Sequence, residues 1–233
     1  MAETSATRRE IPTPRRALVV GATGLIGREL LARLLGDPGC ASVTVISRKP
    51  LGQVDAQARL TVLATGFERL PEPFPTVDDV FIALGTTIKV AGSEAAFRAV
   101  DLDLVVQVAR VARAAGASRL GVVSALGADA GSRVFYNRVK GEMQAAVCAL
   151  GYESVVIAQP SLLIGDRAAL GQPVRRFEAL AGRLAAPVMA LVPKGVRPIA
   201  AADVAAALLS TLRSAGPGVH LLSSGSMQGA SAS

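Results

Sequence analysis

Short apolar runs alternate along this chain with longer stretches in which apolar residues recur every three or four positions. The short runs are nearly continuous, which is typical of strands buried on both faces of a parallel sheet. The longer stretches have the period of amphipathic helices. The pattern therefore predicts strands at 17–20, 43–46, 61–63, 79–84, 119–123, 154–158 and 219–222, with helices at 25–35, 94–115 and 136–150, and a looser region beyond Pro160 that includes 196–212.

This alternation predicts an α/β fold with a doubly wound, mostly parallel sheet of the Rossmann kind. No internal repeat and no second core follow Pro160, so we expect that region to form a small C-terminal cap on the same domain. We place the domain at residues 16–223. A flexible basic tail is expected at 1–15, and a second flexible tail, of small polar residues, at 224–233.

Composition excludes several classes of protein. The chain has 233 residues, of which 51% are hydrophobic and 18% charged, a balance that excludes intrinsic disorder. Two cysteines and one histidine give no reason to expect a metal site or a histidine-based triad. The net charge of +7 raises the question of nucleic-acid binding, but scattered arginines, six phenylalanines, two tyrosines and no tryptophan disfavour it.

No apolar run reaches the roughly 20 residues that a membrane-spanning helix needs. The best candidate, 180–193, is interrupted by Arg183 and Pro187. The N-terminal stretch has charges and prolines but no apolar segment, so it resembles neither a signal peptide nor an anchor. We therefore expect a cytoplasmic protein without a membrane partner.

Three glycines, Gly21, Gly24 and Gly27, fall between the first predicted strand and the first predicted helix. In that position the first glycine allows a tight turn, the second lets the backbone approach a pyrophosphate, and the third lets helix and strand pack closely. The pattern predicts a dinucleotide site. The alternative is that a chain with 23 glycines places three at this spacing by accident.

The end of the second strand predicts which dinucleotide binds. An acidic residue there would hold the ribose hydroxyls of NAD, whereas a basic one would pair with the 2′-phosphate of NADP. Here the strand runs into Ser47, Arg48 and Lys49, with no acid. Arg48 offers a bidentate, charge-assisted partner, so NADP(H) is favoured. The alternative is that Arg48 and Lys49 are ordinary solvated loop charges.

Tyr136 and Lys140 stand four residues apart in a predicted helix, which puts them on one face about one turn apart. A nearby ammonium favours the phenolate and lowers a tyrosine pKa from about 10, which suits proton exchange with a substrate oxygen. Ser124 ends a strand at the carboxyl edge of the sheet, where its hydroxyl could hold a carbonyl or alcohol. The alternative is that Ser124 only caps the next turn.

With these residues in this order, the chain resembles the short-chain dehydrogenase/reductase superfamily, and most closely its atypical members of the Tat-interacting oxidoreductase-like and NmrA-like group. The shared stretches are GATGLIGREL, VTVISRK, IALGTTIKVAG, VSALGAD and YNRVKGE, and the resemblance covers residues 17 to about 210. It implies an NADP(H)-binding domain. Of the residues already singled out, it implies cofactor contacts for Tyr136 and Lys140. The others that it implies are Thr23, Leu25 and Ile26 in the glycine turn, Leu84, Gly85, Thr86 and Thr87 beside the adenosine half, and Pro160, Ser161, Leu162 and Leu163 along the nicotinamide.

Two positions depart from the family pattern. Asp101, which we count among the cofactor contacts, stands where many members carry Asn, and Gln159 replaces the frequent Arg before the proline. The segment after Pro160 is also shorter than in sugar-nucleotide epimerases and dehydratases, which favours a smaller or apolar substrate. In the same resemblance, Asp203 corresponds to a helix cap.

The function we expect is an NADP(H)-dependent oxidoreductase that transfers a hydride to or from a small carbonyl or alcohol. In it Tyr136 is the acid/base, Lys140 tunes Tyr136 and orients the ribose, and Ser124 steadies the substrate. The alternative is a sensor or protein-interaction module that binds NADP(H) without turnover. The sequence leaves open the substrate, the direction of hydride transfer and whether the chain forms an oligomer.

Overall fold

A seven-stranded parallel sheet forms the centre of the computed structural model, which describes residues 14–48, 51, 58–164, 193 and 195–232. Within these residues every pair of neighbouring strands is parallel, in the order β3-β2-β1-β4-β5-β6-β9. The expected doubly wound α/β fold is confirmed. The strands are β1 (Arg15–Val20), β2 (Cys40–Ser47), β3 (Leu60–Ala64), β4 (Asp79–Ile82), β5 (Arg119–Val123), β6 (Ser154–Gln159) and β9 (Gly218–Ser223).

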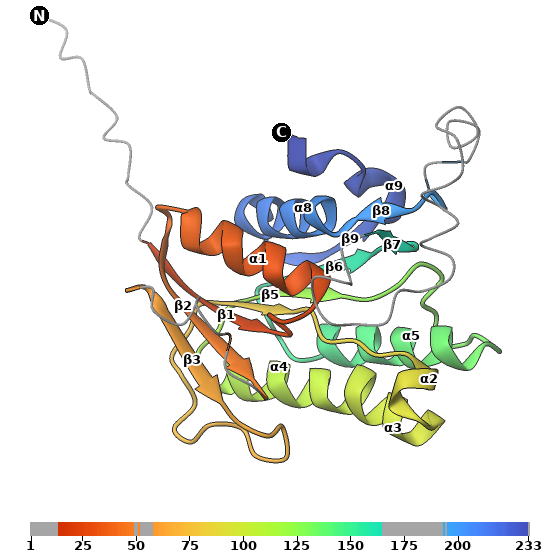
Figure 1. The fold of residues 1–233 in the computed structure, drawn as a ribbon, viewed down its shortest axis with the longest axis horizontal. Helices are drawn as coiled ribbons and strands as arrows, with labels where there is room; N and C mark the ends of the chain where they lie inside the picture. The colour runs from red at the N-terminus through yellow and green to blue at the C-terminus, as the bar shows by residue number, and fades with distance from the viewer. Residues whose placement is uncertain (1–13, 49–50, 52–57, 165–192, 194, 233) are drawn as a thin grey trace, which may run out of the picture.

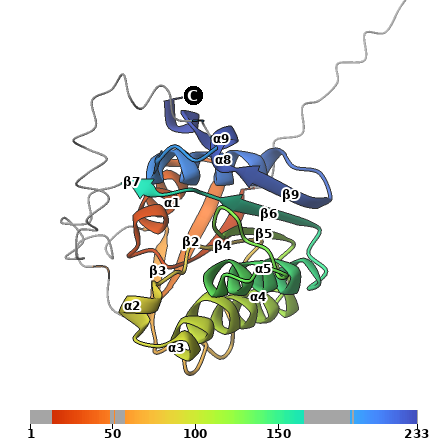
Figure 2. The same ribbon diagram turned by 90° about the vertical axis from the view of Figure 1, so that its right-hand side faces the viewer.

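Helices cover both faces of the sheet, because its central strands are apolar on both sides (Figure 1; Figure 2). On one face α1 (Leu25–Gly36) and α8 (Ala201–Ser214) contribute leucines to a buried cluster. On the other face α4 (Val105–Ala114) and α5 (Phe135–Cys148) do the same with valines and Met143. Two buried layers therefore hold the sheet between them.

The long helix predicted at 94–115 is interrupted. It consists of α3 (Glu94–Arg98), a π-helical segment η2 (Ala99–Leu104) and α4, and a short helix α2 (Ile88–Ala91) precedes it. Side-chain periodicity does not distinguish a π-helical turn from an α-helical one over so short a stretch. Such segments often occur at functional sites.

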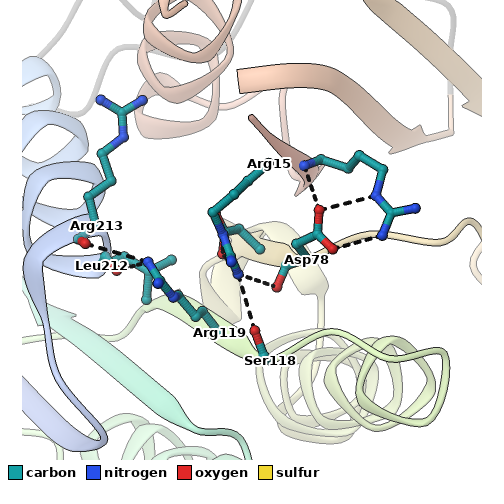
Figure 3. Close-up of polar contacts among 8 residues, drawn as sticks. Arg15, Asp78, Ser118, Arg119, Leu212 and Arg213 are labelled. Atoms are coloured by element: carbon teal, nitrogen blue, oxygen red, sulfur yellow. Dashed lines mark hydrogen bonds and ion pairs between the residues drawn. The ribbon is translucent and has the colours of Figure 1, made fainter. Parts of the chain in front are cut away.

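Polar contacts join the amino-terminal ends of β1, β4 and β5 (Figure 3). Arg15 donates through Nε and Nη2 to the carboxylate of Asp79 at 2.7–2.9 Å, and also to Ser118 Oγ at 3.1 Å. Arg119 donates to the carbonyl of Leu212 at 3.2 Å, which ties β5 to α8. The expected tail at 1–15 is therefore too long by at least one residue, because Arg15 belongs to β1.

The expected flexible tail at 224–233 is wrong for residues 224–232. They form α9 (Ser224–Met227) and a 3-10 turn η4 (Ala230–Ala232), and the Met227 side chain is fully buried. Asp203 holds this segment, because its carboxylate accepts from the backbone N–H groups of Gly229 and Ser231 at 3.1 and 3.0 Å and from Ser231 Oγ at 2.5 Å. Asp203 is thus no cap for α8. The small polar residues of this segment gave no sign in the sequence that it packs against α8.

Beside the main sheet lies a parallel pair of short strands, β7 (Leu163–Ile164) and β8 (Ile199–Ala200). Sequence predictions that fall on 1–13, on Lys49 and on 165–192, including the apolar run 180–193 except its last residue, lie outside the described residues. Within the described ranges, no helix is long and apolar enough to cross a membrane. In the same ranges, no group of His, Cys, Asp and Glu side chains could hold a metal ion.

Candidate functional site

A cleft of about 520 Å³ opens at the carboxyl ends of the strands, where the strand order reverses between β1 and β4. This is the position at which open α/β sheets bind ligands. Its lining comes from the turn after β1 and from the segments after β4, β5 and β6, together with η2 and α5. The lining residues are Gly24, Leu25, Ile26, Ala83, Leu84, Gly85, Thr86, Asp101, Val123, Ser124, Ala125, Leu126, Tyr136, Lys140, Pro160, Ser161, Leu162, Leu163 and Val196.

The turn after β1 requires glycine at two positions. Gly21 has φ +92°, and a Cβ there would lie 2.5 Å from the carbonyl oxygen of Ala83. A Cβ on Gly27 would overlap the carbonyl oxygen of Gly21 and lie 2.6 Å from its carbonyl carbon. Gly24, in contrast, lies on the cleft, and a Cβ there would meet only backbone oxygens at 3.3 and 3.9 Å. The turn thus presents bare backbone at the start of α1, the arrangement that suits a pyrophosphate.

A buried ion pair lies on one wall of the cleft. Lys140 Nζ on α5 is 2.6 Å from Asp101 Oδ1 on η2, and the two side chains are only 4% and 0% exposed. The other carboxylate oxygen, Asp101 Oδ2, accepts from the backbone N–H of Thr86 at 2.9 Å. Asp101 therefore connects α5 to the loop that follows β4.

Tyr136 lines the cleft one turn before Lys140 on the same helix. Its ring packs against Phe97 of α3, with ring centroids 5.4 Å apart, and the Phe97 side chain is fully buried. This contact holds the tyrosine ring beside α3. The sequence spacing correctly predicted that Tyr136 and Lys140 share a face.

A chain of amides supports Ser124, which stands just after β5. Ser124 Oγ accepts from Gln144 Nε2 at 2.6 Å, and Gln144 Oε1 accepts from Gln159 Nε2 at 3.3 Å. Because a hydroxyl has a single proton, a Ser124 that accepts from Gln144 keeps that proton to donate elsewhere. Sequence reasoning missed Gln144. Its position four residues after Lys140, on the same helical face, was the available signal.

The segment after β6 is anchored from behind. Ser161 Oγ donates to the carbonyl of Arg197 at 2.5 Å and accepts from Ser224 Oγ at 2.9 Å. Ser161, Leu162 and Leu163 nevertheless line the cleft, as does Val196, which the sequence reasoning did not single out. The docked C-terminal segment thus supports one wall of the site.

The structure gathers most of the sequence-predicted residues in this cleft, but not all. Six described ones lie outside its lining: Gly21, Thr23, Gly27, Ser47, Arg48 and Thr87. Gly21 and Gly27 shape the turn from behind, and Ser47 is buried at the end of β2. Arg48 is exposed immediately after β2, beside the cleft-forming end of β1. Lys49 is outside the described residues. The bare glycine turn and the cleft onto which it opens fit a dinucleotide.

Comparison with known proteins agrees with this geometry. Residues 21–157 match a family described as NAD(P)H-binding. The chain is 36% identical over 156 residues to the mitochondrial protein fmp52 of Emericella nidulans, covering 64% of this chain and 67% of that protein. It is 34% identical over 157 residues to HTATIP2 of Rattus norvegicus, covering 66% of this chain and 64% of that protein.

Solved structures share the fold at low sequence identity. MoeE5 in complex with UDP-glucose and NAD has a TM-score of 0.67 at 18% identity, over 89% of this chain and 76% of that one. The Bordetella bronchiseptica enzyme WbmG in complex with NAD has a TM-score of 0.65 at 20% identity, over 94% and 75%. At these identities the likeness supports the Rossmann-type fold.

These relatives also correct one expectation. The sequence, with no apolar N-terminal segment, predicted a cytoplasmic protein. That prediction is wrong on this comparison, because fmp52 of Emericella nidulans, of Aspergillus clavatus and of Eremothecium gossypii are all named mitochondrial proteins.

The glycine turn, the cleft at the reversal of strand order, the family match over residues 21–157 and the relatives that match 64% and 66% of this chain agree with one another. The resemblance to atypical short-chain dehydrogenases/reductases predicted from the sequence is confirmed, and the chain belongs to the NAD(P)H-binding family.

Proposed function

We propose that the protein is an NADP(H)-dependent oxidoreductase of the atypical short-chain dehydrogenase/reductase type, acting on a small carbonyl or alcohol. The observation that carries this proposal is the meeting of Ser124, Tyr136 and Lys140 in the cleft that also contains Gly24 of the glycine turn. The glycine turn would be enough for a site that only binds the cofactor. The phenol of Tyr136 beside the hydroxyl of Ser124 adds groups that suit proton transfer to or from a substrate oxygen.

In this proposal the side chains share the work on the substrate oxygen. Tyr136 gives a proton to the oxygen in reduction, or takes one from it in oxidation. Ser124 holds the same oxygen by donating its proton, which the bond that it accepts from Gln144 leaves free. Lys140 orients the nicotinamide ribose of the cofactor. The bound nicotinamide supplies or accepts the hydride.

The preference for NADP(H) over NAD(H) rests on Arg48. It is exposed immediately after β2, and β2 pairs with β1 on the side next to the glycine turn. A guanidinium there can pair with a 2′-phosphate through two hydrogen bonds, and Ser47 beside it brings no charge that would repel the phosphate.

The deciding experiment is a titration of the protein with NADPH and with NADH, followed by the emission of the reduced nicotinamide. The chain has no tryptophan to interfere with this emission. Wild type is expected to bind NADPH at least tenfold more tightly than NADH, a difference of about 1.4 kcal/mol. Arg48→Ala should remove this preference by weakening NADPH binding alone. Arg110→Ala, an exposed arginine on α4, is the matched control and should bind both as wild type does.

Turnover is tested with a panel of aldehydes and ketones and NADPH. Tyr136→Phe should keep cofactor affinity and lose reduction of any compound that wild type reduces. Equal loss of NADPH and NADH binding in Arg48→Ala would contradict the 2′-phosphate assignment. NADPH binding without reduction of any compound would favour the alternative of a cofactor-binding sensor or interaction module.

A further inference from the structure

Asp101 and Lys140 form an ion pair that is buried in the wall of the cleft. Both side chains are almost completely buried, with 2.6 Å between Lys140 Nζ and Asp101 Oδ1. A buried charge is tolerated only when it is paired and hydrogen-bonded. Asp101 therefore compensates the charge of Lys140 within the protein, before any ligand is considered.

Asp101 is also fixed in place by the backbone. The N–H of Thr86 donates to its second oxygen at 2.9 Å, and η2 presents the side chain from a π-helical segment. With one oxygen on Lys140 and the other on Thr86, the carboxylate cannot move away without losing a charge-assisted bond. Thr86 and Asp101 line the same cleft as Lys140.

This pairing changes what Lys140 can do to Tyr136. An isolated ammonium one turn away would draw the phenol toward its ionised state. A carboxylate 2.6 Å from that ammonium has the opposite effect, because its negative charge disfavours the phenolate. A phenol that keeps its proton is in the state needed to protonate a carbonyl oxygen during reduction.

Other described charges near Tyr136 are engaged elsewhere or exposed to solvent. Those on the elements around it are Arg98, which pairs with Glu142 at 2.5 Å, Arg138, which lies over the Phe135 ring and donates to the carbonyl of Ser132, and the exposed Lys89, Glu94, Asp103, Asp129 and Arg133. Lys140 and Asp101, in contrast, are a buried charged pair and line the same cleft as Tyr136.

We propose that Asp101 is a positioning residue that holds Lys140 and offsets its charge, so that Tyr136 remains a protonated phenol and the site is poised for carbonyl reduction. The proposal rests on the oxidoreductase function proposed above. It adds a residue whose part the glycine turn and the Tyr136–Lys140 spacing do not reveal.

The absorbance of the phenolate allows a test that needs no substrate, because the chain has two tyrosines and no tryptophan. The second tyrosine, Tyr152, is buried and donates to the carbonyl of Ala109 at 2.7 Å. Burial raises the pKa of Tyr152 well above its ordinary value. The phenolate signal that appears first as the pH rises therefore belongs to Tyr136, and Tyr136→Phe is the control that removes it.

Four proteins are compared by this titration: wild type, Asp101→Asn, Lys140→Gln and the double variant. Asp101→Asn keeps the shape of the side chain and removes its charge, so the midpoint should fall by about one pH unit, as for a phenol beside an uncompensated cation. Lys140→Gln leaves the carboxylate alone and should raise the midpoint. The double variant has neither charge and should titrate close to wild type.

The comparison of Lys140→Gln with the double variant decides the result if Asp101→Asn alone does not fold or if its lysine loses its proton. A fall in the midpoint on adding Asp101→Asn, in either background, supports the proposal. No fall in either background overturns it. Circular dichroism on each variant identifies the folded ones. Failure of the wild-type protein to bind NADPH would instead contradict the proposed function, so the two failures are distinguishable.

Discussion

Two glycines of the same turn are expected to respond in opposite ways to an added methyl group. Gly24→Ala introduces a Cβ whose nearest neighbour is the carbonyl oxygen of Gly21 at 3.3 Å, so the turn needs to give by only a few tenths of an ångström. Gly27→Ala introduces a Cβ that overlaps that same oxygen and lies 2.6 Å from its carbon and 2.9 Å from Ala22 Cα. These are backbone atoms and cannot rotate aside.

The magnitudes follow from these distances. We expect Gly24→Ala to change the free energy of unfolding by less than about 1 kcal/mol, because mild crowding is offset by a less flexible unfolded chain. Gly27→Ala should cost about 1–3 kcal/mol as an overpacked position between a helix and a strand. For a chain of this size each kcal/mol corresponds to about 2–4 °C in Tm.

Function should follow the reverse order. Gly24 lines the cleft, so its methyl group occupies space into which we place the pyrophosphate, and NADPH affinity should fall at least tenfold, or about 1.4 kcal/mol. The assay combines thermal unfolding by circular dichroism with the nicotinamide fluorescence titration. Wild-type NADPH affinity in Gly24→Ala would refute the placement of the pyrophosphate. A wild-type Tm in Gly27→Ala would refute the close-packing argument.

The remaining predictions concern stability away from the cleft. Arg15→Ala leaves the carboxylate of Asp79, 12% exposed, without its charged partner and should lower the free energy of unfolding by about 2 kcal/mol, measured by urea denaturation. Arg16→Ala, which breaks an exposed pair, is the control and should change it far less; equal effects would contradict the burial argument. Burial opposes ionisation of Asp203, but hydrogen bonds from Ser231 and Gly229 outweigh it and lower its pKa below the ordinary 3.8. The stability that Asp203 gives the C-terminal segment is therefore complete at neutral pH and lost as the pH falls through the lowered pKa, and hydrogen exchange at Gly229 should accelerate only there.

The C-terminal part shows where sequence reasoning fails. Residues 224–232 are small and polar, and nothing in their local pattern predicts order. They are held by Asp203, which lies in the first turn of α8, and by the burial of Met227. Neither partner can be identified without knowing that α8 and the chain end lie side by side. The same limit produced the incorrect role for Asp203 as a helix cap.

Local pattern by itself determined the parallel sheet, the glycine turn and the shared face of Tyr136 and Lys140. These depend on periods of two and 3.6 residues and on backbone conformations that glycine alone adopts easily, all of which are properties of neighbouring residues. The tertiary structure alone decided that Asp101 pairs with Lys140 and that Gln144 donates to Ser124. Those contacts join residues about 20 to 40 positions apart. The packing of α5 against η2 and β5 brings them within hydrogen-bonding distance, and periodicity specifies a face but not the partner that it meets.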